Sequence, residues 1–244
     1  MYRYKCIISY DGTNFMGFQI QDDLRTVELE IKNALFKLTN EDIKIYSSGR
    51  TDRYVHALGQ VIHFDLENEI PPLGLKRGIN SYLPKDIYFK TIEQVDVNFH
   101  ARFSAKSKEY RYYINKKEYS PLLANYQAFI SYKLDYNLMG EAIKLFIGTH
   151  NFKGFSSSSI DPRKDTVKTI FEAKMNEHDD YLEFIFVGTG FLKYQIRRMM
   201  GILIDIGRGK LDINIINHIL ETQDTNILFK TADGCGLYLY QVNY

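Results

Sequence analysis

The sequence predicts an α+β fold in which antiparallel sheets carry helices on one side. Segments of alternating apolar and polar residues, typical of strands, are interspersed with segments that have an apolar stripe at helical spacing. Both halves of the chain share the order strand, helix, strand, strand, helix, without a clear sequence repeat. The 244 residues suffice for one large domain or two small ones, and a content of 45% hydrophobic and 25% charged residues is ordinary for a globular protein.

The first half is predicted to begin with an alternating strand from Tyr2 to Ser9 and a turn that contains Gly12. A helix follows, with Thr26 as its N-cap and an apolar stripe that covers a sheet. The stripe consists of Leu24, Val27, Ile31, Ala34, Leu35 and Leu38. The remaining expected elements are an apolar run at Ile43–Tyr46, a polar loop, a strand at Gln60–Phe64, a short helix between Pro72 and Pro84, and a strand at Ile87–Val95.

The second half opens with a basic linker and an alternating strand that carries Tyr110, Tyr112 and Ile114 on one face. Buried strand tyrosines with paired hydroxyls are common, although one of them could instead stack on a nucleic-acid base. The further elements expected are a helix at Asp135–Ile147, a mobile basic loop from Ser156 to Lys164, a hairpin of strands at Val167–Met175 and Tyr181–Val187, an apolar helix at Phe191–Gly201, a capped helix from Asp212 and a strand at Leu237–Val242. The basic loop is either a solvated connection or a phosphate contact.

Composition narrows the possible compartments and partners. A net charge of +1 argues against a polybasic binder but leaves room for a local basic groove. Cys6 and Cys235 lie in apolar, strand-like context and predict buried thiols rather than a disulfide or a metal site. The N-terminus lacks the apolar segment of a signal peptide, and the most apolar run, Met199–Ile206, is too short to span a bilayer. We therefore expect a cytoplasmic protein with no membrane partner.

The polar loop between the apolar run Ile43–Tyr46 and the strand Gln60–Phe64 is the strongest candidate for a functional site, since loops held by a rigid scaffold often carry functional residues. It contains one acid, Asp52, between Arg50 and Arg53. Such a cluster is often a surface ion pair. It also suits a carboxylate nucleophile, because a neighbouring guanidinium favours the ionised form that nucleophilic attack requires.

The motif Gly49-Arg50-Thr51-Asp52, followed by Val55-His56-Ala57, Gly59-Gln60-Val61 and His63-Phe64, resembles the active-site segment of the TruA family of tRNA pseudouridine synthases. The resemblance extends from Tyr10 to about Gly201. It includes the N-terminal block Tyr10–Gln21, which forms part of the family's active-site wall, and the block Gly148–Phe155.

The resemblance implies that Asp52 is the catalytic nucleophile and that Arg50, Tyr110 and Arg197 are also catalytic. Arg197 aligns with the family arginine that pairs with the aspartate. Arg50 would help to displace the target base, and Tyr110 would stack on the uracil and assist proton removal from C5. Arg50, Arg53, Arg102 and Tyr110 are the expected substrate-binding residues. The expected substrate is RNA, most specifically uridines 38–40 of the tRNA anticodon stem-loop.

The resemblance also implies an architecture of two similar α+β domains, at residues 1–98 and 99–244, with a basic cleft between them and a homodimeric assembly. The implied reaction converts uridine into its isomer pseudouridine. No atom is gained, so no cofactor or metal is expected.

Several positions depart from the family pattern, among them Ile196 before Arg197, where the pattern has valine. Tyr54 occupies a place where the family usually has glycine, and if that glycine is needed for positive φ, Tyr54 implies strain or a different loop. Phe18 replaces a common tryptophan and Glu28 a common glutamine. The change at Tyr54 is two residues from Asp52 and bears on substrate choice.

Other readings remain open from the sequence. The chain could be a paralogue that modifies another structured RNA, or an RNA-binding protein without catalysis, although Asp52, Tyr110 and Arg197 disfavour the latter. A glycoside hydrolase normally needs two opposed carboxylates, and the loop offers one. A metal-dependent hydrolase fits the sequence even less well, because no further acidic residue near His56 and His63 completes a metal-ligand pattern. The two residues are better interpreted as ordinary hydrogen-bonded histidines. The sequence leaves open whether Asp52 attacks uracil C6 or ribose C1′.

Overall fold

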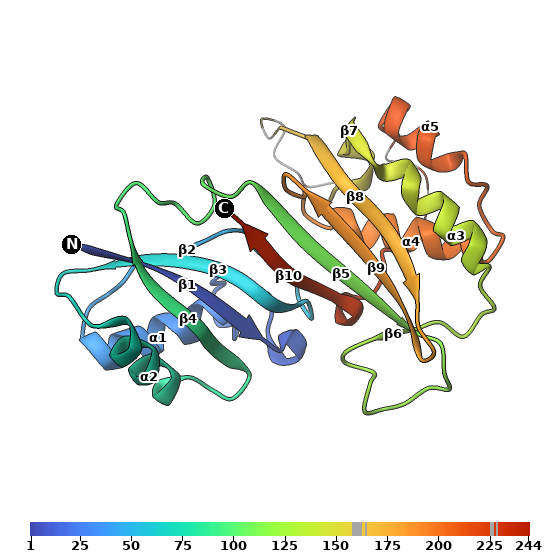
Figure 1. The fold of residues 1–244 in the computed structure, drawn as a ribbon. Helices are drawn as coiled ribbons and strands as arrows, with labels where there is room; N and C mark the ends of the chain where they lie inside the picture. Colours follow the sequence, from blue (N-terminus) through green and yellow to red (C-terminus); the bar gives the residue numbers. More distant parts are fainter. Residues whose placement is uncertain (158–162, 164, 225–226, 228) are drawn as a thin grey trace. The chain divides into compact units, whose positions relative to one another are not determined.

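The computed structural model describes residues 1–157, 163, 165–224, 227 and 229–244. Its strands and helices confirm the predicted α+β class (Figure 1). The chain forms two compact units, described in turn below: unit 1 comprises Met1–Lys106 with Tyr238–Tyr244, and unit 2 comprises Ser107–Leu237. The domain boundaries expected from the sequence, 1–98 and 99–244, stay a prediction.

Unit 1 is built on a sheet with the strand order β4-β1-β3-β10. β1 pairs antiparallel with both β3 and β4, and the short β2 pairs antiparallel with β3. β10, from the C-terminal end of the chain, runs parallel to β3, which departs from the all-antiparallel expectation. The bounds of these strands are Tyr2–Tyr10 for β1, Tyr46–Ser47 for β2, His56–Leu66 for β3, Ile87–Val95 for β4 and Leu237–Asn243 for β10.

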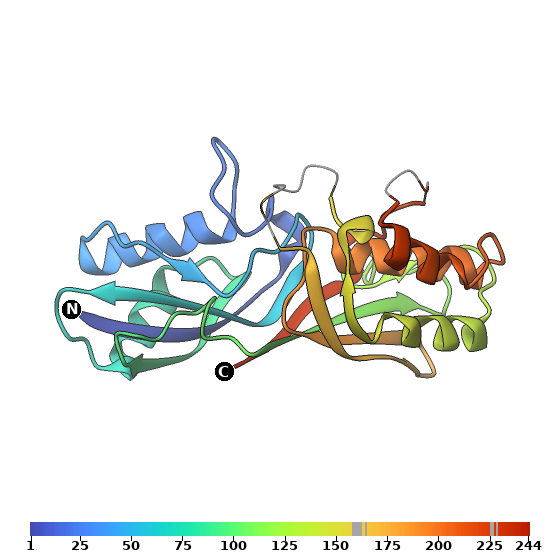
Figure 2. The same cartoon turned by 90° about the horizontal axis from the view of Figure 1, so that it is seen from above.

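One face of this sheet forms the core of unit 1. Alternate residues of β1 point into it, and Tyr4, Cys6 and Ile8 are fully buried, as their period-2 pattern predicts. Figure 2 shows α1 (Val27–Thr39) lying over the strands, and α1 packs against α2 (Pro72–Tyr82). β3 is buried on nearly all its length and lies between β1 and β10.

The helix α1 begins after Thr26, as predicted, but the Thr26 hydroxyl forms no capping bond and is buried without a hydrogen-bond partner among the described residues. The apolar stripe is confirmed in part: Val27, Ile31, Ala34 and Leu35 are buried, whereas Leu38 is half-buried. Leu24 precedes the helix. The helix ends at Asn40, which adopts φ 59°.

Unit 2 has a sheet with the order β5-β9-β8-β7, in which neighbouring strands are antiparallel. The predicted hairpin of β8 and β9 turns at residues 178–180, and a short β6 pairs with β5 in parallel. The strand bounds are Ser107–Asn115 for β5, Ala128–Phe129 for β6, Gly148–Asn151 for β7, Val167–Glu177 for β8 and Tyr181–Gly188 for β9. The helices are α3 (Tyr136–Ala142), α4 (Gln195–Gly207) and α5 (Ile215–Thr222), and α3 packs against both α4 and β8.

Two predicted helices have different limits in the structure. The apolar helix starts at Gln195 rather than Phe191, because Tyr194 adopts φ 64° and cannot continue a right-handed helix backwards. The helix expected at 135–147 ends at Ala142 and continues as a 3₁₀ turn, Ile143–Phe146. Of the basic loop predicted at 156–164, residues 158–162 and 164 lie outside the described residues.

Short 3₁₀ turns complete the described chain: η1 (Gly12–Asn14), η2 (Ile143–Phe146), η3 (Lys153–Phe155) and η4 (Gly234–Gly236). None of the helices within the described ranges has the length and apolar character that crossing a membrane requires.

Candidate active site

The loop that carries Asp52 connects β2 to β3 in unit 1, as predicted. Thr51 is buried and Asp52 is half-buried, whereas Arg53 and Tyr54 are exposed. The Val55 amide donates to the Asp52 carbonyl at 3.2 Å and closes a four-residue turn. The carboxylate of Asp52 therefore stands at the first position of a tight turn whose backbone conformation is restricted.

A buried glutamine on β3 holds the start of this loop. The Gln60 side-chain nitrogen donates to the Gly49 carbonyl at 2.8 Å, and its oxygen accepts a hydrogen bond from the Ser48 hydroxyl at 2.6 Å. Gln60 and Ser48 are 0% exposed. These bonds satisfy polar groups that water cannot reach and fix the backbone that precedes Arg50.

A buried tyrosine on β1 holds the residue before Asp52. The hydroxyls of Tyr10 and Thr51 form a hydrogen bond of 2.8 Å. Burial raises the pKa of Tyr10, which keeps its phenol protonated and in hydrogen-bonding form at neutral pH. Thr51 is thereby anchored to the core strand.

The N-terminal block packs on the same loop, backbone against backbone. The Phe18 amide donates to the Thr51 carbonyl at 3.1 Å. Gly17 has φ 98°, and a Cβ at this residue would lie 3.0 Å from the Thr51 oxygen. A Cβ on Gly12 would lie 2.2 Å from the Val55 oxygen. Both glycines therefore permit an approach that no side chain allows.

Two histidines of β3, the strand that follows the loop, are hydrogen-bonded, as predicted. His56 Nδ1 accepts from the Gly12 amide at 3.0 Å and lies 3.3 Å from Asp11 Oδ1. His63 Nδ1 accepts from the Ala101 amide at 3.1 Å. Burial, together with the nearby Arg3, lowers the pKa of His63 to about 4, so its imidazole is neutral at physiological pH. Over the described ranges, no group of three or more His, Cys, Asp and Glu side chains is arranged to hold a metal ion.

The residues after Asp52 form an exposed pair. The Arg53 guanidinium carbon lies 4.3 Å from the centre of the Tyr54 ring, and the guanidinium donates to the Tyr54 hydroxyl. Tyr54 has φ 66°, so the positive φ expected at this position is present without a glycine. A non-glycine residue in such a conformation costs on the order of 1–3 kcal/mol. Arg50 is also exposed.

The arginine predicted from the linker, Arg102, is exposed in unit 1, and its guanidinium carbon lies 5.8 Å from the Phe103 ring centre. Unit 1 therefore contains Arg50, Asp52, Arg53 and Arg102, of which the first three share one loop.

Unit 2 contains the other two predicted site residues. Tyr110 lies on β5 and is 9% exposed, with its ring edge-on to Phe191 at 5.3 Å. Arg197 lies in the first turn of α4, and its Nε donates to the Ala232 carbonyl at 2.8 Å. The Ala232 amide in turn donates to the Arg197 carbonyl at 3.0 Å. These contacts orient the guanidinium, and its predicted pairing with Asp52 stays a prediction.

The neighbouring arginine has a different environment. Arg198 is half-buried, and its guanidinium carbon lies 4.4 Å from the centre of the Phe229 ring. Burial lowers its pKa, and its Nε has no hydrogen-bond partner among the described residues. The two consecutive arginines therefore have different surroundings.

The supporting residues Gln60 and Tyr10 were not assigned a role from the sequence. The available signal was a glutamine directly before the apolar pair Val61-Ile62 in a predicted strand, since a buried amide needs partners. Which groups serve as partners depends on where the loop folds back, and the sequence pattern does not reveal this.

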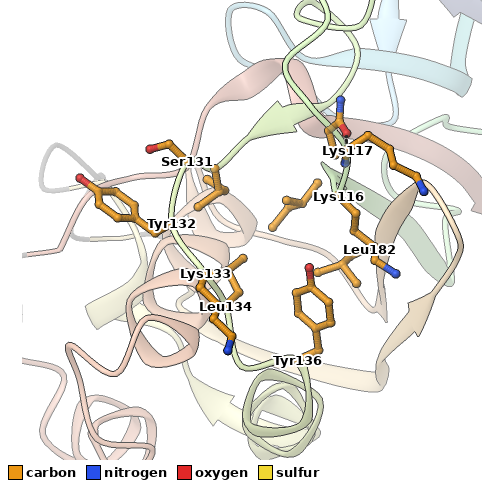
Figure 3. Close-up of a pocket in the computed structure, with 11 residues that line it drawn as sticks. Lys116, Lys117, Ser131, Tyr132, Lys133, Leu134, Tyr136 and Leu182 are labelled. Carbon is orange, nitrogen blue, oxygen red and sulfur yellow. Dashed lines mark hydrogen bonds between the residues drawn. The ribbon is translucent and has the colours of Figure 1, made fainter.

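A cavity of about 380 Å³ lies in unit 2 (Figure 3). Its lining includes Lys116, Lys117, Lys133 and Tyr136, with the Lys116 ammonium 5.5 Å from the Tyr136 ring centre. Glu177 pairs with Lys116 at 2.6 Å, so part of the positive charge is compensated. None of the predicted site residues lines this cavity.

Comparison with known proteins identifies the family. The profile of a family described as tRNA pseudouridine synthase matches residues 6–104 and 142–244. Proteins named tRNA pseudouridine synthase A are similar over nearly the whole chain. One from an Exiguobacterium species is 44% identical, covering 100% of this chain and 98% of its own length. One from a Geobacillus species is 45% identical, covering 99% and 98%. One from Streptococcus mutans is 42% identical, covering 100% and 99%. The chain belongs to the tRNA pseudouridine synthase family, the TruA family that its motifs indicated.

Proposed function

We propose that this pseudouridine synthase acts on uridines 38–40 in the anticodon stem-loop of tRNA, with Asp52 as the nucleophile. The names of its full-length relatives support tRNA as the substrate. The observation that carries the catalytic assignment is the Asp52 loop itself, in which Gln60 and Tyr10 restrain the backbone before one half-buried carboxylate and the Val55 amide closes the turn that follows it. A restrained carboxylate is what nucleophilic attack at a fixed position needs.

In this proposal the reaction breaks the N1–C1′ glycosidic bond of uridine and forms a C5–C1′ bond in its place. C5 loses a proton and N1 gains one, so the isomerisation is redox-neutral and needs no cofactor or metal. Attack by Asp52 at uracil C6 and attack at ribose C1′ both begin from the ionised carboxylate. Both also require the uracil to leave its stack, at a cost of a few kcal/mol.

The remaining site residues take the following roles. Arg50 fills the space that the extruded base vacates and contacts the RNA. Tyr110 stacks on the uracil and assists removal of the C5 proton. Arg197 keeps Asp52 ionised and oriented, because a guanidinium beside a carboxylate favours the charged form. Arg53 and Arg102, both exposed, bind the RNA.

We further propose that the two domains enclose a basic cleft that binds the RNA, that the protein is a homodimer, and that it works in the cytoplasm, where tRNA is processed. Light scattering of the purified protein tests the dimer.

The decisive experiment replaces Asp52 with asparagine, which keeps the size and removes the charge. With an unmodified tRNA transcript, Asp52→Asn should form no pseudouridine while its affinity for the transcript changes little. Asp22→Asn, an exposed acid of the same unit, is the matched control and should retain full activity. Retained activity in Asp52→Asn would remove the nucleophile assignment. An inactive wild-type protein that still binds the transcript would favour the non-catalytic alternative, and conversion confined to another structured RNA would favour the paralogue.

A further inference from the structure

We propose that Arg53 and Tyr54 form a stacking platform for an unpaired RNA base next to the target uridine. This inference deepens the function proposed above and rests on it. It names the group that the loop recognises, which is the flat face of a base adjoining the reacting nucleotide.

The backbone at Tyr54 is the first observation. Tyr54 is the third residue of the turn that the Val55 amide closes on the Asp52 carbonyl, and it adopts φ 66°. Turns with positive φ at this position favour glycine, because an L side chain is strained there. The side chain at this point therefore imposes a backbone strain that glycine would avoid, and strained residues of this kind cluster at functional sites.

The exposure of the ring is the second observation. Tyr54 is 41% exposed, so its ring is not retained for burial in the core. A tyrosine with a strained backbone and a solvent-exposed ring is suited to contact a binding partner. A base face is a suitable partner, since RNA-binding proteins commonly stack unpaired bases on tyrosine and on guanidinium planes.

The pairing with Arg53 is the third observation. The guanidinium carbon lies 4.3 Å from the ring centre, and the guanidinium donates to the Tyr54 hydroxyl. Across the residues that the structure describes, Arg53 forms no ion pair with a carboxylate. Its charge is thus available to a phosphate, while the ring presents a flat surface. Because the two side chains already hold one another, less conformational freedom is lost when RNA binds.

The distance along the chain connects this pair to the chemistry. Consecutive Cα atoms are about 3.8 Å apart, so the Cα of Tyr54 lies within about 7.6 Å of the Cα of Asp52. A base stacked on Tyr54 is therefore a close neighbour of a uracil that reacts at Asp52. When that uracil is extruded, the adjoining base loses a stacking partner, and Tyr54 replaces it.

The first test measures affinity for an RNA hairpin that corresponds to an unmodified anticodon arm. Asp52→Asn protein serves as the background, so that no turnover alters the RNA. Tyr54→Leu should raise the dissociation constant about tenfold, within the range of roughly 5- to 150-fold that loss of one stacked base produces. Tyr54→Phe should weaken it less than threefold. The matched control is Tyr88→Leu on β4, an exposed tyrosine with the Lys76 ammonium 5.6 Å from its ring centre, and it should leave the affinity unchanged.

The second test asks which nucleotide the platform binds. Hairpins with a single abasic site are compared at each position adjoining the target uridine. An abasic site at one of these positions should weaken binding to the protein that retains Tyr54 about tenfold. The same abasic site should leave binding to Tyr54→Leu unchanged, because that variant already lacks the stacking contact. Unchanged affinity in Tyr54→Leu, or abasic effects that are equal in both proteins at every position, would overturn the platform.

Pseudouridine formation by the protein with native Asp52 is measured separately on the same hairpin. Absence of pseudouridine there refutes the proposed function, whereas a normal product yield combined with unaltered affinity of Tyr54→Leu refutes only the platform. Thermal unfolding of each variant shows that the comparison is made between folded proteins.

Discussion

Gln60 on the buried strand β3 and Ser48 at the start of the Asp52 loop form a fully buried hydrogen bond of 2.6 Å. The same glutamine also binds the Gly49 carbonyl at 2.8 Å. A strand residue thus determines where the loop begins, although eleven peptide bonds separate it from Gly49 along the chain. The position of the candidate nucleophile depends on this contact.

Gln60→Leu should lower the free energy of unfolding by about 2–4 kcal/mol, because the Ser48 hydroxyl and the Gly49 carbonyl lose their buried partner. Urea unfolding of the purified protein measures the change. Ser48→Ala removes one bond, and the Gln60 side-chain oxygen still accepts from the Val61 amide at 3.1 Å, so this change should cost less, about 1–2 kcal/mol. A loss in Gln60→Leu no larger than that in Ser48→Ala would contradict the anchoring role.

Gly17→Ala should lower the free energy of unfolding by about 1–3 kcal/mol, since φ 98° is strained for alanine and the new Cβ lies 3.0 Å from the Thr51 oxygen. It should also reduce the rate of pseudouridine formation, because the displaced backbone belongs to the residue before Asp52. The matched control is Gly74→Ala in the first turn of α2, where nothing lies within 4 Å of the new Cβ. That change should stabilise the protein by about 0.5–1 kcal/mol through helix propensity. Equal effects of the two substitutions would disprove the close-approach explanation.

Tyr54→Val should be less stable than Tyr54→Gly by about 1–2 kcal/mol, because a β-branched side chain suits positive φ poorly and glycine adopts it freely. Tyr54→Gly should be about as stable as the wild type, since relief of strain offsets the loss of the Arg53 contact. Thermal unfolding of the three proteins provides the ranking. A valine variant as stable as the glycine variant would show that the turn is not strained at this residue.

Acid should destabilise the protein through His63. Its pKa is about 4 in the folded protein and 6.5 in the unfolded chain, so the unfolded state binds more protons between these values. The contribution of His63 is complete above pH 6.5 and is lost as the pH falls towards 4. Integration over this window corresponds to roughly 3 kcal/mol. Denaturant unfolding at a series of pH values should show a shallower pH dependence for His63→Gln than for the wild type. The exposed His218→Gln is the control and should retain the wild-type profile between pH 4 and 6.5.

Local elements were predictable wherever one pattern dominated. The strand Ile87–Val95 has the predicted limits, and the β8–β9 hairpin turns where polar residues interrupt two alternating runs. Errors arose at element ends. The start of α4 depends on the left-handed conformation of Tyr194, which its side chain does not signal. The missing cap bond at Thr26 is a matter of side-chain orientation rather than of residue type.

The sequence alone determined the fold class, the family and the loop with Asp52, because periodicity is local and a long motif is specific. Only the tertiary structure decided that β10 runs parallel to β3, that Gln60 and Tyr10 hold the loop, and that Tyr54 takes the conformation expected of glycine. These features depend on which distant groups meet after the chain has collapsed. Buried polar atoms then take whatever partners the packing brings within reach, and that choice is made by the whole fold rather than by neighbouring residues.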